Sequence, residues 1–332
     1  MGKLPLEELK SLLSCIKKDS RVIVPPMVGY DFGVNLFDGK YMVVATDPCT
    51  GVPGEWFGWL LINYAASDVA LSGAKPEFCT INLLGPKSTK PEAFQKVMNQ
   101  ICKAADELDI AIVRGHTGTY SSISSLLGVA TVYGGVQLEK LITPANAKPG
   151  DLILCTKPLG METITNFSIA NKELAEKLFG FEHQEKLSKQ VYLQSCVREA
   201  IELAKTDLVH AMHDATEGGF VAALNELAEA SKLGFKISWE NITIYKELLV
   251  LQSQFRLTDE QLLAASSTGT IIAAIDPQNK EKITEVLNQN GLSPSFIGEF
   301  SENKDRVLIR NGKKGAFPLT SDDPYDKILS GK

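Results

Sequence analysis

The sequence has little that would place the protein in a membrane. Its most apolar segment, LLINYAASDVALSGA, is interrupted by Asn63, Ser67 and Asp68, so it falls short of the roughly 18 consecutive apolar residues of a membrane-spanning helix. The first residues, MGKLPLEELKSLLSCIKK, alternate charges with Leu and Ile at helical spacing and lack the apolar core of a secretory signal. We therefore expect a surface helix there, in a cytoplasmic protein with no membrane partner.

An excess of positive charge is also missing. Lys and Arg number 34 against 40 Asp and Glu, a net charge of -6, which provides no general attraction for nucleic acid or anionic lipid. The six cysteines include no C-x-x-C pair and no compact framework, so we expect reduced thiols rather than disulfides. Nucleic acid is therefore not an expected partner.

Several catalytic signatures are absent. There is no G-x-x-x-x-G-K-[ST] and no G-x-G-x-x-G between a strand and a helix, which argues against a P-loop kinase and a Rossmann dehydrogenase. There is likewise no H-E-x-x-H and no G-x-S-x-G, which argues against a zinc hydrolase and a serine nucleophile. Cys49 is the one thiol near the site expected below, and a partly buried filler thiol is its simpler interpretation.

Length and element order predict two domains. A chain of 332 residues exceeds the usual size of a single core. The segment TPANAKPGD marks a boundary, because two prolines and a Pro-Gly-Asp turn precede a new strand. We place one domain at residues 1–145 and the other at 146–332. Strands and helices alternate in both halves, which predicts α/β or α+β domains.

Residue patterns predict the individual elements. Residues 29–40 are interpreted as a loop between two strands, with a hairpin-type turn at Asp38-Gly39. Helices are expected at 55–73, 91–108, 161–178, 185–205 and 216–234. Strands are expected at 21–24, 41–46, 78–84, 109–115, 125–136, 152–156, 267–275, 295–300 and 306–310.

Four aspartates have surroundings that suggest a metal-nucleotide site. Asp31 lies in GYDFGV, Asp47 closes the strand VVATDP, Asp68 lies in an apolar helix, and Asp214 precedes a Gly-rich helix start in MHDATEGGF. A buried carboxylate costs several kcal/mol unless it is paired or bound to a metal. Magnesium takes carboxylate, phosphate and water oxygens, so converging aspartates would hold it together with a nucleotide. Each aspartate taken alone could equally be a turn residue, a strand-end or helix cap, or an acceptor of N–H groups.

The order of six segments resembles the superfamily of aminoimidazole ribonucleotide synthase, thiamine-monophosphate kinase, selenophosphate synthetase and the hydrogenase-maturation carbamoyl dehydratase. The similarity runs from about residue 20 to about residue 310, and it is closest to the hydrogenase-maturation branch. It implies a two-domain α/β fold in which the first domains of two subunits pair into a shared β-barrel. It also implies ATP in a cleft, with magnesium held by aspartates of both domains. The segments are GYDFGV, VVATDP, INYAASDVALSGAKPEF, RGHTGTY, AKPGDLILCT and MHDATEGGFVAALNELAEAS.

The resemblance assigns roles to the same four aspartates. Asp31 matches the second acidic position of the family's Gly-Asp-Asp-Ala-Ala segment, and Tyr30 replaces the first, so the resemblance implies that one ligand or one hydrogen bond is missing there. His116 stands where several branches carry Asp or Glu. The hydrogenase-maturation branch ends in a cysteine that receives a carbamoyl group, whereas this sequence ends at Lys332, so that chemistry is not expected on its own tail.

The leading expectation is an ATP- and magnesium-dependent enzyme that transfers the γ-phosphoryl group to an oxygen of a small-molecule substrate. A homodimer is expected, and a maturation partner protein is compatible with the resemblance. The rival is a non-catalytic ATP-binding maturation or sensing partner, and thiamine-phosphate phosphorylation, purine ring closure and amide dehydration all stay open within the enzyme class. The expected set comprises Asp31, Asp47, Asp68 and Asp214 as metal and nucleotide ligands, Gly33, Gly115, Gly218 and Gly219 beside the nucleotide, and His116, Thr117 and His213 at the substrate.

Overall fold

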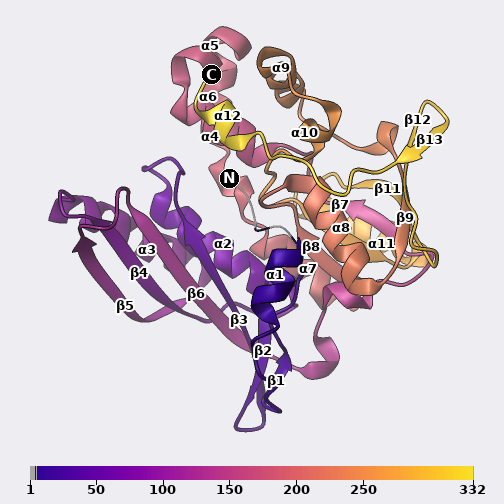
Figure 1. Cartoon of the computed structure of the whole chain (residues 1–332), viewed down its shortest axis with the longest axis horizontal. Coiled ribbons are helices and arrows are strands. Elements are labelled where there is room, and N and C mark those ends of the chain that lie inside the picture. The colour runs from indigo at the N-terminus through magenta and orange to yellow at the C-terminus, as the bar shows by residue number, and fades with distance from the viewer. Residues whose placement is uncertain (1–3, 5, 332) are drawn as a thin grey trace. The chain divides into compact units, whose positions relative to one another are not determined.

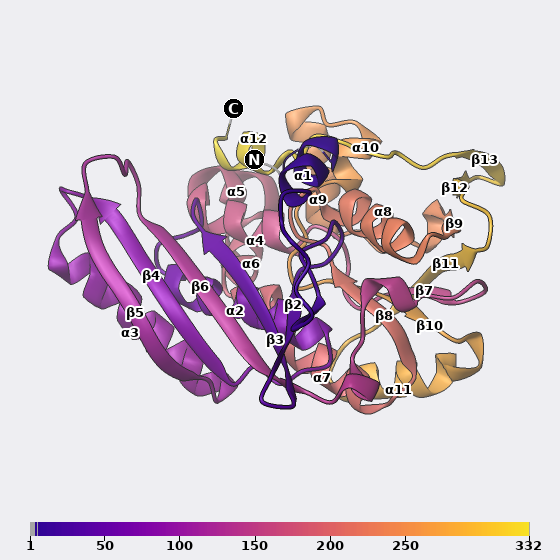
Figure 2. The same cartoon turned by 60° about the horizontal axis from the view of Figure 1, so that its bottom comes forward.

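The computed structural model describes residue 4 and residues 6–331. The chain forms two compact units. Unit 1 contains the described residues within 1–17, 27–30 and 142–332, and unit 2 contains residues 18–26 and 31–141. Figures 1 and 2 show the elements of both units, and each unit is described by itself below.

Unit 2 is a six-stranded mixed sheet with two helices on one face (Figure 1). The strand order is β1-β2-β3-β6-β4-β5, and β4 and β5 form the one parallel pair among these described strands. Helix α2 packs against the inner strands β3 and β6, and α3 packs against α2 and the edge strand β5. The elements are β1 (Val22–Val24), β2 (Gly33–Phe37), β3 (Lys40–Cys49), α2 (Phe57–Leu71), β4 (Phe78–Pro86), α3 (Pro91–Leu108), β5 (Ala111–Tyr120) and β6 (Leu127–Val136).

The predicted turn at Asp38-Gly39 is confirmed, but the strand before it was missed. Asp38 and Gly39 both have positive φ, at 49° and 73°, as a tight two-residue hairpin requires. The turn joins β2 to β3, so the interpretation of all of residues 29–40 as a loop is wrong for residues 33–37. A five-residue strand that mixes Gly and Asn with apolar residues lacks the continuous β-branched run that would have revealed it.

Helices α2 and α3 form the covering layer of unit 2. Of the 15 residues of helix α2, 14 are buried, and the helix contacts β3 and β6 of the sheet and the neighbouring helix α3. The two helices approach closely at Gly58, where a Cβ atom would lie 2.4 Å from the carbonyl oxygen of Val97. Helix α3 begins at Pro91, as predicted, and ends at Asp109 in a left-handed conformation.

Unit 1 is a seven-stranded sheet of order β13-β12-β9-β11-β7-β10-β8 between helical layers. In Figures 1 and 2, α8 covers one face while α7 and α11 lie on the other. The sheet elements and these helices are β7 (Leu152–Cys155), α7 (Val197–Lys205), β8 (Val209–Asp214), α8 (Gly219–Ser231), β9 (Gly234–Ser238), β10 (Ile271–Ile275), α11 (Lys280–Gln289), β11 (Ser295–Ser301), β12 (Arg306–Arg310) and β13 (Lys313–Ala316).

The remaining helices of unit 1, apart from α1, contribute to an apolar cluster that includes Ile164, Phe167 and Leu251. The predicted N-terminal surface helix is present as α1. No helix among the described residues is long and apolar enough to span a membrane. These helices are α1 (Leu6–Leu13), α4 (Met161–Ala170), α5 (Lys172–Phe179), α6 (Phe181–Ser188), α9 (Lys246–Phe255), α10 (Asp259–Leu263) and α12 (Tyr325–Leu329), with a short 3-10 turn at Val191–Gln194.

Two predicted helices are each interrupted in the structure. At each break, a side chain donates hydrogen bonds to backbone carbonyls that are distant from it in sequence. The helix expected at 161–178 breaks at Asn171, whose side-chain amide donates to the carbonyl of Leu329. The helix expected at 185–205 breaks between α6 and α7. Between these two helices, the ammonium of Lys157 donates hydrogen bonds to the backbone carbonyls of Leu193 and Ser195, both at 2.9 Å. These carbonyls therefore bind a side chain and not the N–H groups of a continuing helix. Both partners are remote in sequence, so helical periodicity alone could not reveal the breaks.

Candidate functional site

Two of the predicted aspartates of unit 2 belong to the layer between α2 and the sheet. Asp68 lies in α2 and is 7% exposed. Asp47 lies on β3 opposite Ala130 of β6, which is fully buried. Because paired residues of neighbouring strands share a face, Asp47 points to the same side of the sheet as Ala130, the side that α2 covers. Asp31 lies in the bend just before β2 and is half-buried.

These carboxylates have the chemistry that magnesium requires. Among the described residues of unit 2, no three His, Cys, Asp or Glu ligand atoms lie within 4.8 Å of one another. The unit therefore offers no closed protein cage of the kind that calcium or zinc takes. Magnesium is commonly held by one or two carboxylates together with phosphate oxygens and water, so Asp47 and Asp68 fit it as partial ligands.

His116 and Thr117 were both expected at the substrate, but they lie on opposite faces of strand β5. His116 is paired with Asn82 of β4, and the side chain of Asn82 is exposed. Thr117 is paired with Leu83 of β4, and the side chain of Leu83 is buried. The two side chains therefore point to opposite faces of the sheet. On its face, His116 makes a hydrogen bond of 2.7 Å with the Tyr120 hydroxyl.

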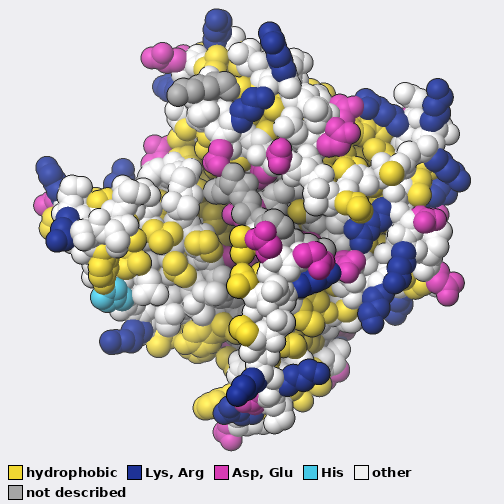
Figure 3. All heavy atoms as spheres, in the orientation of Figure 1, with side chains coloured by type: hydrophobic (Ala, Val, Ile, Leu, Met, Phe, Trp, Pro, Cys, Tyr) yellow, Lys and Arg dark blue, Asp and Glu magenta, His cyan; other side chains and the backbone are white. Residues whose placement is uncertain are grey.

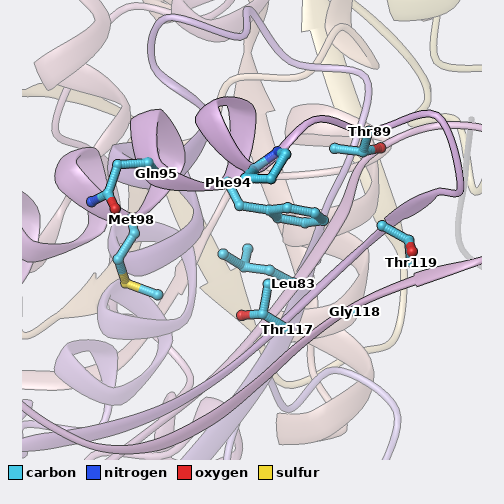
Figure 4. A pocket seen from close by; sticks show the side chains of 9 residues that line it. Leu83, Thr89, Phe94, Gln95, Met98, Thr117, Gly118 and Thr119 are labelled. Carbon is cyan, nitrogen blue, oxygen red and sulfur yellow. The ribbon is translucent and has the colours of Figure 1, made fainter.

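Thr117 lines a cavity of about 590 Å³ beside α3 (Figure 4). Its apolar floor is formed by Leu83, Phe94 and Met98, and the hydroxyls of Thr89 and Thr119 lie at its rim. Gly115 has a packing role, because a Cβ atom there would lie 2.7 Å from the carbonyl oxygen of Ile81. Gly33 begins β2.

In unit 1, His213 and Asp214 end strand β8 and are each 1% exposed. A ring nitrogen of His213 and a carboxylate oxygen of Asp214 lie within 4.8 Å of each other. His213 Nδ1 is 2.8 Å from the carbonyl oxygen of Asp214, and Nε2 is 2.9 Å from a carboxylate oxygen of Glu226 on α8. The ring is thus held at both nitrogens, which suits a residue that orients its neighbours. Sequence reasoning missed Glu226, because a glutamate within an amphipathic helix gives no signal of a buried partner.

The two glycines at the start of α8 are required by the backbone. Gly218 and Gly219 have φ of 79° and 56°, and a Cβ atom on Gly219 would lie 2.5 Å from the carbonyl oxygen of Ala265. The N–H of Gly218 donates to a carboxylate oxygen of Asp323, at 3.1 Å. The hydroxyl of Ser266 donates to the same oxygen, at 2.5 Å. The helix start is therefore already capped by a carboxylate from the C-terminal segment, which no sequence pattern had indicated.

Burial raises the pKa of Asp323 above its usual value, against the opposing effect of hydrogen bonds from Ser266, Gly218 and Tyr325. Burial likewise raises the pKa of Tyr30, which replaces the carboxylate expected at that position, and hydrogen bonds with Thr143 and Ala145 oppose the shift. Tyr30 therefore stays a neutral phenol at physiological pH and cannot substitute for an acidic metal ligand.

Cys49 is buried, with its sulfur 3.7 Å from the carbonyl oxygen of Phe57. All six cysteines are free thiols in the structure. Burial raises the pKa of Cys155 to about 12 and that of Cys79 to about 11, so neither is a reactive thiolate at neutral pH.

A cavity lies in unit 1 along α8, and we name it the α8 pocket. It measures about 1130 Å³ and lies between α8, α1, Val28 and the segments 304–306 and 316–323. Gly218 is one of its lining residues. In Figure 3, acidic side chains gather over the region of α1 and α8.

Comparisons with known proteins agree with this architecture. Residues 29–136 match the family described as AIR synthase related protein, N-terminal domain, and residues 148–310 match its C-terminal domain. A Methanocaldococcus jannaschii protein described as a hydrogenase expression/formation protein is 26% identical over 259 residues, covering 77% of this chain and 74% of the relative. The selenide, water dikinase of Carboxydothermus hydrogenoformans is 25% identical over 303 residues, covering 82% and 84%.

Solved structures share the fold at low sequence identity. Escherichia coli HypE has a TM-score of 0.75 at 21% identity, covering 97% of this chain and 99% of that chain. A thiamine monophosphate kinase relative described as AaThiL complexed with AMPPCP and TMP has a TM-score of 0.71 at 19% identity, covering 94% and 97%. A HypE structure in complex with ATP has a TM-score of 0.68 at 17% identity, covering 96% and 93%.

Proposed function

The chain belongs to the AIR synthase-related family, and from that premise we propose that it is an ATP- and magnesium-dependent enzyme. In this proposal it transfers the γ-phosphoryl group to an oxygen of a small substrate, either as the product or to turn that oxygen into a leaving group. The observation that carries the proposal is Asp68, a carboxylate only 7% exposed in a helix whose residues are mostly apolar. Keeping such a group ionised is costly, and a bound cation offsets that cost.

Each predicted residue has a role in this proposal. Asp47 and Asp68 would hold magnesium from the α2 side of the sheet, and Asp31 and Asp214 would complete the metal and nucleotide contacts. Magnesium supplies neutralisation of the phosphate charge during transfer, which is the main requirement of this reaction. Gly33, Gly115, Gly218 and Gly219 would lie beside the nucleotide. We place nucleotide binding and subunit pairing in residues 1–145, and the second domain in residues 146–332.

The three residues expected at the substrate, His116, Thr117 and His213, have different tasks in this proposal. His213 is buried and held by Glu226, so its proposed task is to orient Asp214. Thr117 faces a cavity, so its hydroxyl is the better candidate for contact with a small molecule. His116 is exposed on the opposite face of β5, and its proposed task is at a subunit contact.

Homodimer formation is supported by the exposed edge of unit 2. Strand β5 ends the sheet, and nine of its ten residues are exposed, including the apolar Ile112, Val113 and Tyr120. Open edges with apolar side chains favour pairing with another strand. A HypE-HypF complex exists among the similar structures, so a maturation partner protein is also compatible. A cytoplasmic location completes the proposal.

The alternative is a non-catalytic ATP-binding maturation or sensing protein, and Tyr30 in place of a carboxylate favours it. A thiamine-monophosphate-kinase-like phosphotransferase is a second enzyme candidate, because the AaThiL fold is similar. ATP turnover with and without magnesium, measured against a panel of phosphate acceptors and amides, separates these functions. Acceptor-dependent release of ADP supports the enzyme. Tight Mg-ATP binding without turnover for any acceptor supports the sensing protein, and absence of ATP binding contradicts both.

A further inference from the structure

A lysine, a histidine and an aspartate of unit 1 form a hydrogen-bonded row outside the site described above. Nδ1 of His210 lies 3.0 and 2.9 Å from the two carboxylate oxygens of Asp151. Nε2 of the same ring lies 3.0 Å from Nζ of Lys148. The Asp151 side chain is 4% exposed and the His210 side chain is 22% exposed, whereas Lys148 is exposed. The row therefore runs from a buried carboxylate to an ammonium that solutes can reach.

The fold fixes the position of both ends of this row. The pairing of β8 with β10 shifts its register between Ala274 and Ile275, which leaves His210 without a partner on β10. A bulge of this kind commonly re-aims a side chain. The backbone N–H of Lys148 donates to the Asp151 carboxylate at 2.7 Å, and the N–H of Asp151 donates to the Lys148 carbonyl at 3.1 Å. Lys148 and Asp151 thus belong to one closed turn that faces the bulge.

The hydrogen-bond partners determine which ring nitrogen of His210 carries the proton. An ammonium can only donate, so Nε2 accepts from Lys148 with its lone pair. Nδ1 then carries the hydrogen and donates it to Asp151. The ring is neutral in this arrangement, and its basic nitrogen is directed at one proton of the lysine. Asp151 holds this tautomer and stabilises the positive charge of the ring when the ring takes up that proton.

The partner of Lys148 differs in kind from that of Lys75 in unit 2. Lys75 is also exposed, but it donates to the carboxylate of Asp109, and this hydrogen bond raises the pKa of Lys75. A carboxylate stabilises the ammonium and so suppresses the nucleophilic amine. Within the described part of the chain, no carboxylate forms an ion pair with Lys148. Its neutral imidazole partner can take up a proton and release the lone pair of Nζ.

We propose that Lys148 is a nucleophilic lysine that is acylated by an acyl phosphate, with His210 as general base and Asp151 as a positioning residue. One ammonium proton passes to Nε2 of His210, and the lone pair of Nζ attacks the acyl carbon. The C–N bond forms, and the C–O bond to phosphate breaks with its electron pair. A second proton goes from the nitrogen to the departing group, which leaves as hydrogen phosphate. His210 returns its proton to water, and the lysine ends as a neutral amide.

An acyl phosphate fits this site better than a neutral ester does. Its anionic phosphate is attracted by the ammonium of Lys148 before the reaction and by the imidazolium of His210 as it departs. A neutral ester gains neither attraction. The proposal goes beyond the proposed function, because it uses none of the residues of the metal-nucleotide site and no ATP.

Acetyl phosphate is the probe for this reaction. The full-length protein is incubated with it at neutral pH, and peptide mass spectrometry measures the acetylation rate of each lysine. Lys96 of α3 is exposed and has no side-chain partner among the described residues, so it represents an unassisted lysine. We expect Lys148 to react at least about tenfold faster than Lys96, and Lys75 to react more slowly than Lys96. A Lys148 rate within about twofold of the Lys96 rate overturns the proposal.

Phenyl acetate tests the class of acyl donor. It carries the same acyl group on a neutral ester, so the rate advantage of Lys148 over Lys96 should be smaller with phenyl acetate than with acetyl phosphate. An equal or larger advantage with phenyl acetate overturns the assignment of an acyl phosphate.

A matched pair of substitutions identifies the base. His210→Asn removes the imidazole beside Lys148, and His183→Asn removes another histidine of unit 1 that bonds to a carboxylate, that of Glu247. Melting curves establish that both variants fold, and His210→Gln takes the place of His210→Asn if that variant is unfolded. We expect His210→Asn to lower the Lys148 rate to within about twofold of the Lys96 rate, and His183→Asn to leave it unchanged. An unchanged Lys148 rate in His210→Asn, or an equal loss in both variants, overturns the general base.

Proton–nitrogen correlation spectra of the histidine side chains test the role of Asp151 without any reaction. The signals of His210 are identified by their absence from His210→Asn, and we expect the Nδ1–H tautomer in the wild type. Asp151→Asn offers the ring a donor as well as an acceptor, so the share of the Nε2–H tautomer should rise and the Lys148 rate should fall. An Nε2–H tautomer in the wild type overturns the proposal. An unchanged tautomer and rate in Asp151→Asn overturn the positioning role.

Discussion

Replacing Lys157 by Met should destabilise unit 1 strongly. The Lys157 side chain is 5% exposed, and its ammonium donates to the carbonyls of Leu193, Ser195 and Gly269 at 2.9, 2.9 and 2.7 Å. These three bonds use all three of its protons. The carboxylate of Glu199 forms an ion pair with the same ammonium. One cation therefore connects the turn before α7 with the loop before β10.

The expected cost follows from what the substitution leaves behind. Lys157→Met leaves a buried Glu199 carboxylate without its counter-charge and three carbonyls without their donor. Removing one partner of a buried ion pair typically costs about 3–5 kcal/mol. Glu199→Gln retains the ammonium and its three hydrogen bonds, so we expect a smaller loss, about 1–3 kcal/mol.

Equilibrium urea unfolding measures the free energy of unfolding of both variants and so shows which substitution is the more destabilising. Hydrogen exchange of β7 and β10 reports whether the loss is located in unit 1, since the folded chain has two units. The reasoning is refuted if Glu199→Gln costs as much as Lys157→Met. That result would mean that the ion pair, and not the three carbonyl contacts, dominates the stabilisation.

Three further predictions follow from single contacts. Gly219→Ala should lower stability by more than about 2 kcal/mol, because the new Cβ meets the carbonyl oxygen of Ala265 at 2.5 Å. Gly291→Ala, which follows the end of α11 with a positive φ of 75° and has open space around it, should cost only about 1 kcal/mol in the same melts. The pKa of Asp323 is raised by burial, so its protonated form favours the folded state below the unfolded pKa, and this contribution is lost as pH rises through the folded pKa. The melting temperature of the wild type relative to Asp323→Asn should therefore fall as pH rises from about 4 towards neutrality, and a constant difference would contradict the burial effect. Because His116 and Thr117 lie on opposite faces of β5, the effects of His116→Ala and Thr117→Val on ATP turnover should add, and strong non-additivity would indicate a shared task.

Helices and turns were predicted well where local sequence patterns alone determine the structure. Helix α3 has Pro91 at its start and an apolar stripe that packs against α2 and β5, so its bounds of 91–108 were predicted correctly. The Asp38-Gly39 turn was likewise readable, because few residues adopt positive φ twice in succession. The two-unit α/β architecture follows from the alternation of such elements.

Contacts between distant residues account for what sequence missed. The breaks at Asn171 and before α7 depend on Leu329 and Lys157, and neither is within helical reach. Asp323 reaches Gly218 across 105 positions, and Glu226 reaches His213 across 13. Asp68 could be singled out because a carboxylate in an apolar helix is unusual by itself. Asp323 and Glu226 have ordinary polar neighbours in sequence, so only the fold identifies them.

The affinity of Asp68→Asn for Mg-ATP tests the central claim most directly. The replacement keeps the shape of a side chain that is 7% exposed in α2 and removes its charge. Calorimetric titration of Mg-ATP, beside a melting curve of the same variant, separates ligand binding from folding. The account predicts a nearly unchanged melting temperature and a magnesium-dependent ATP affinity lowered by at least about tenfold. Unchanged ATP affinity together with a lowered melting temperature would contradict it, since Asp68 would then be a structural acceptor and not part of a metal-nucleotide site.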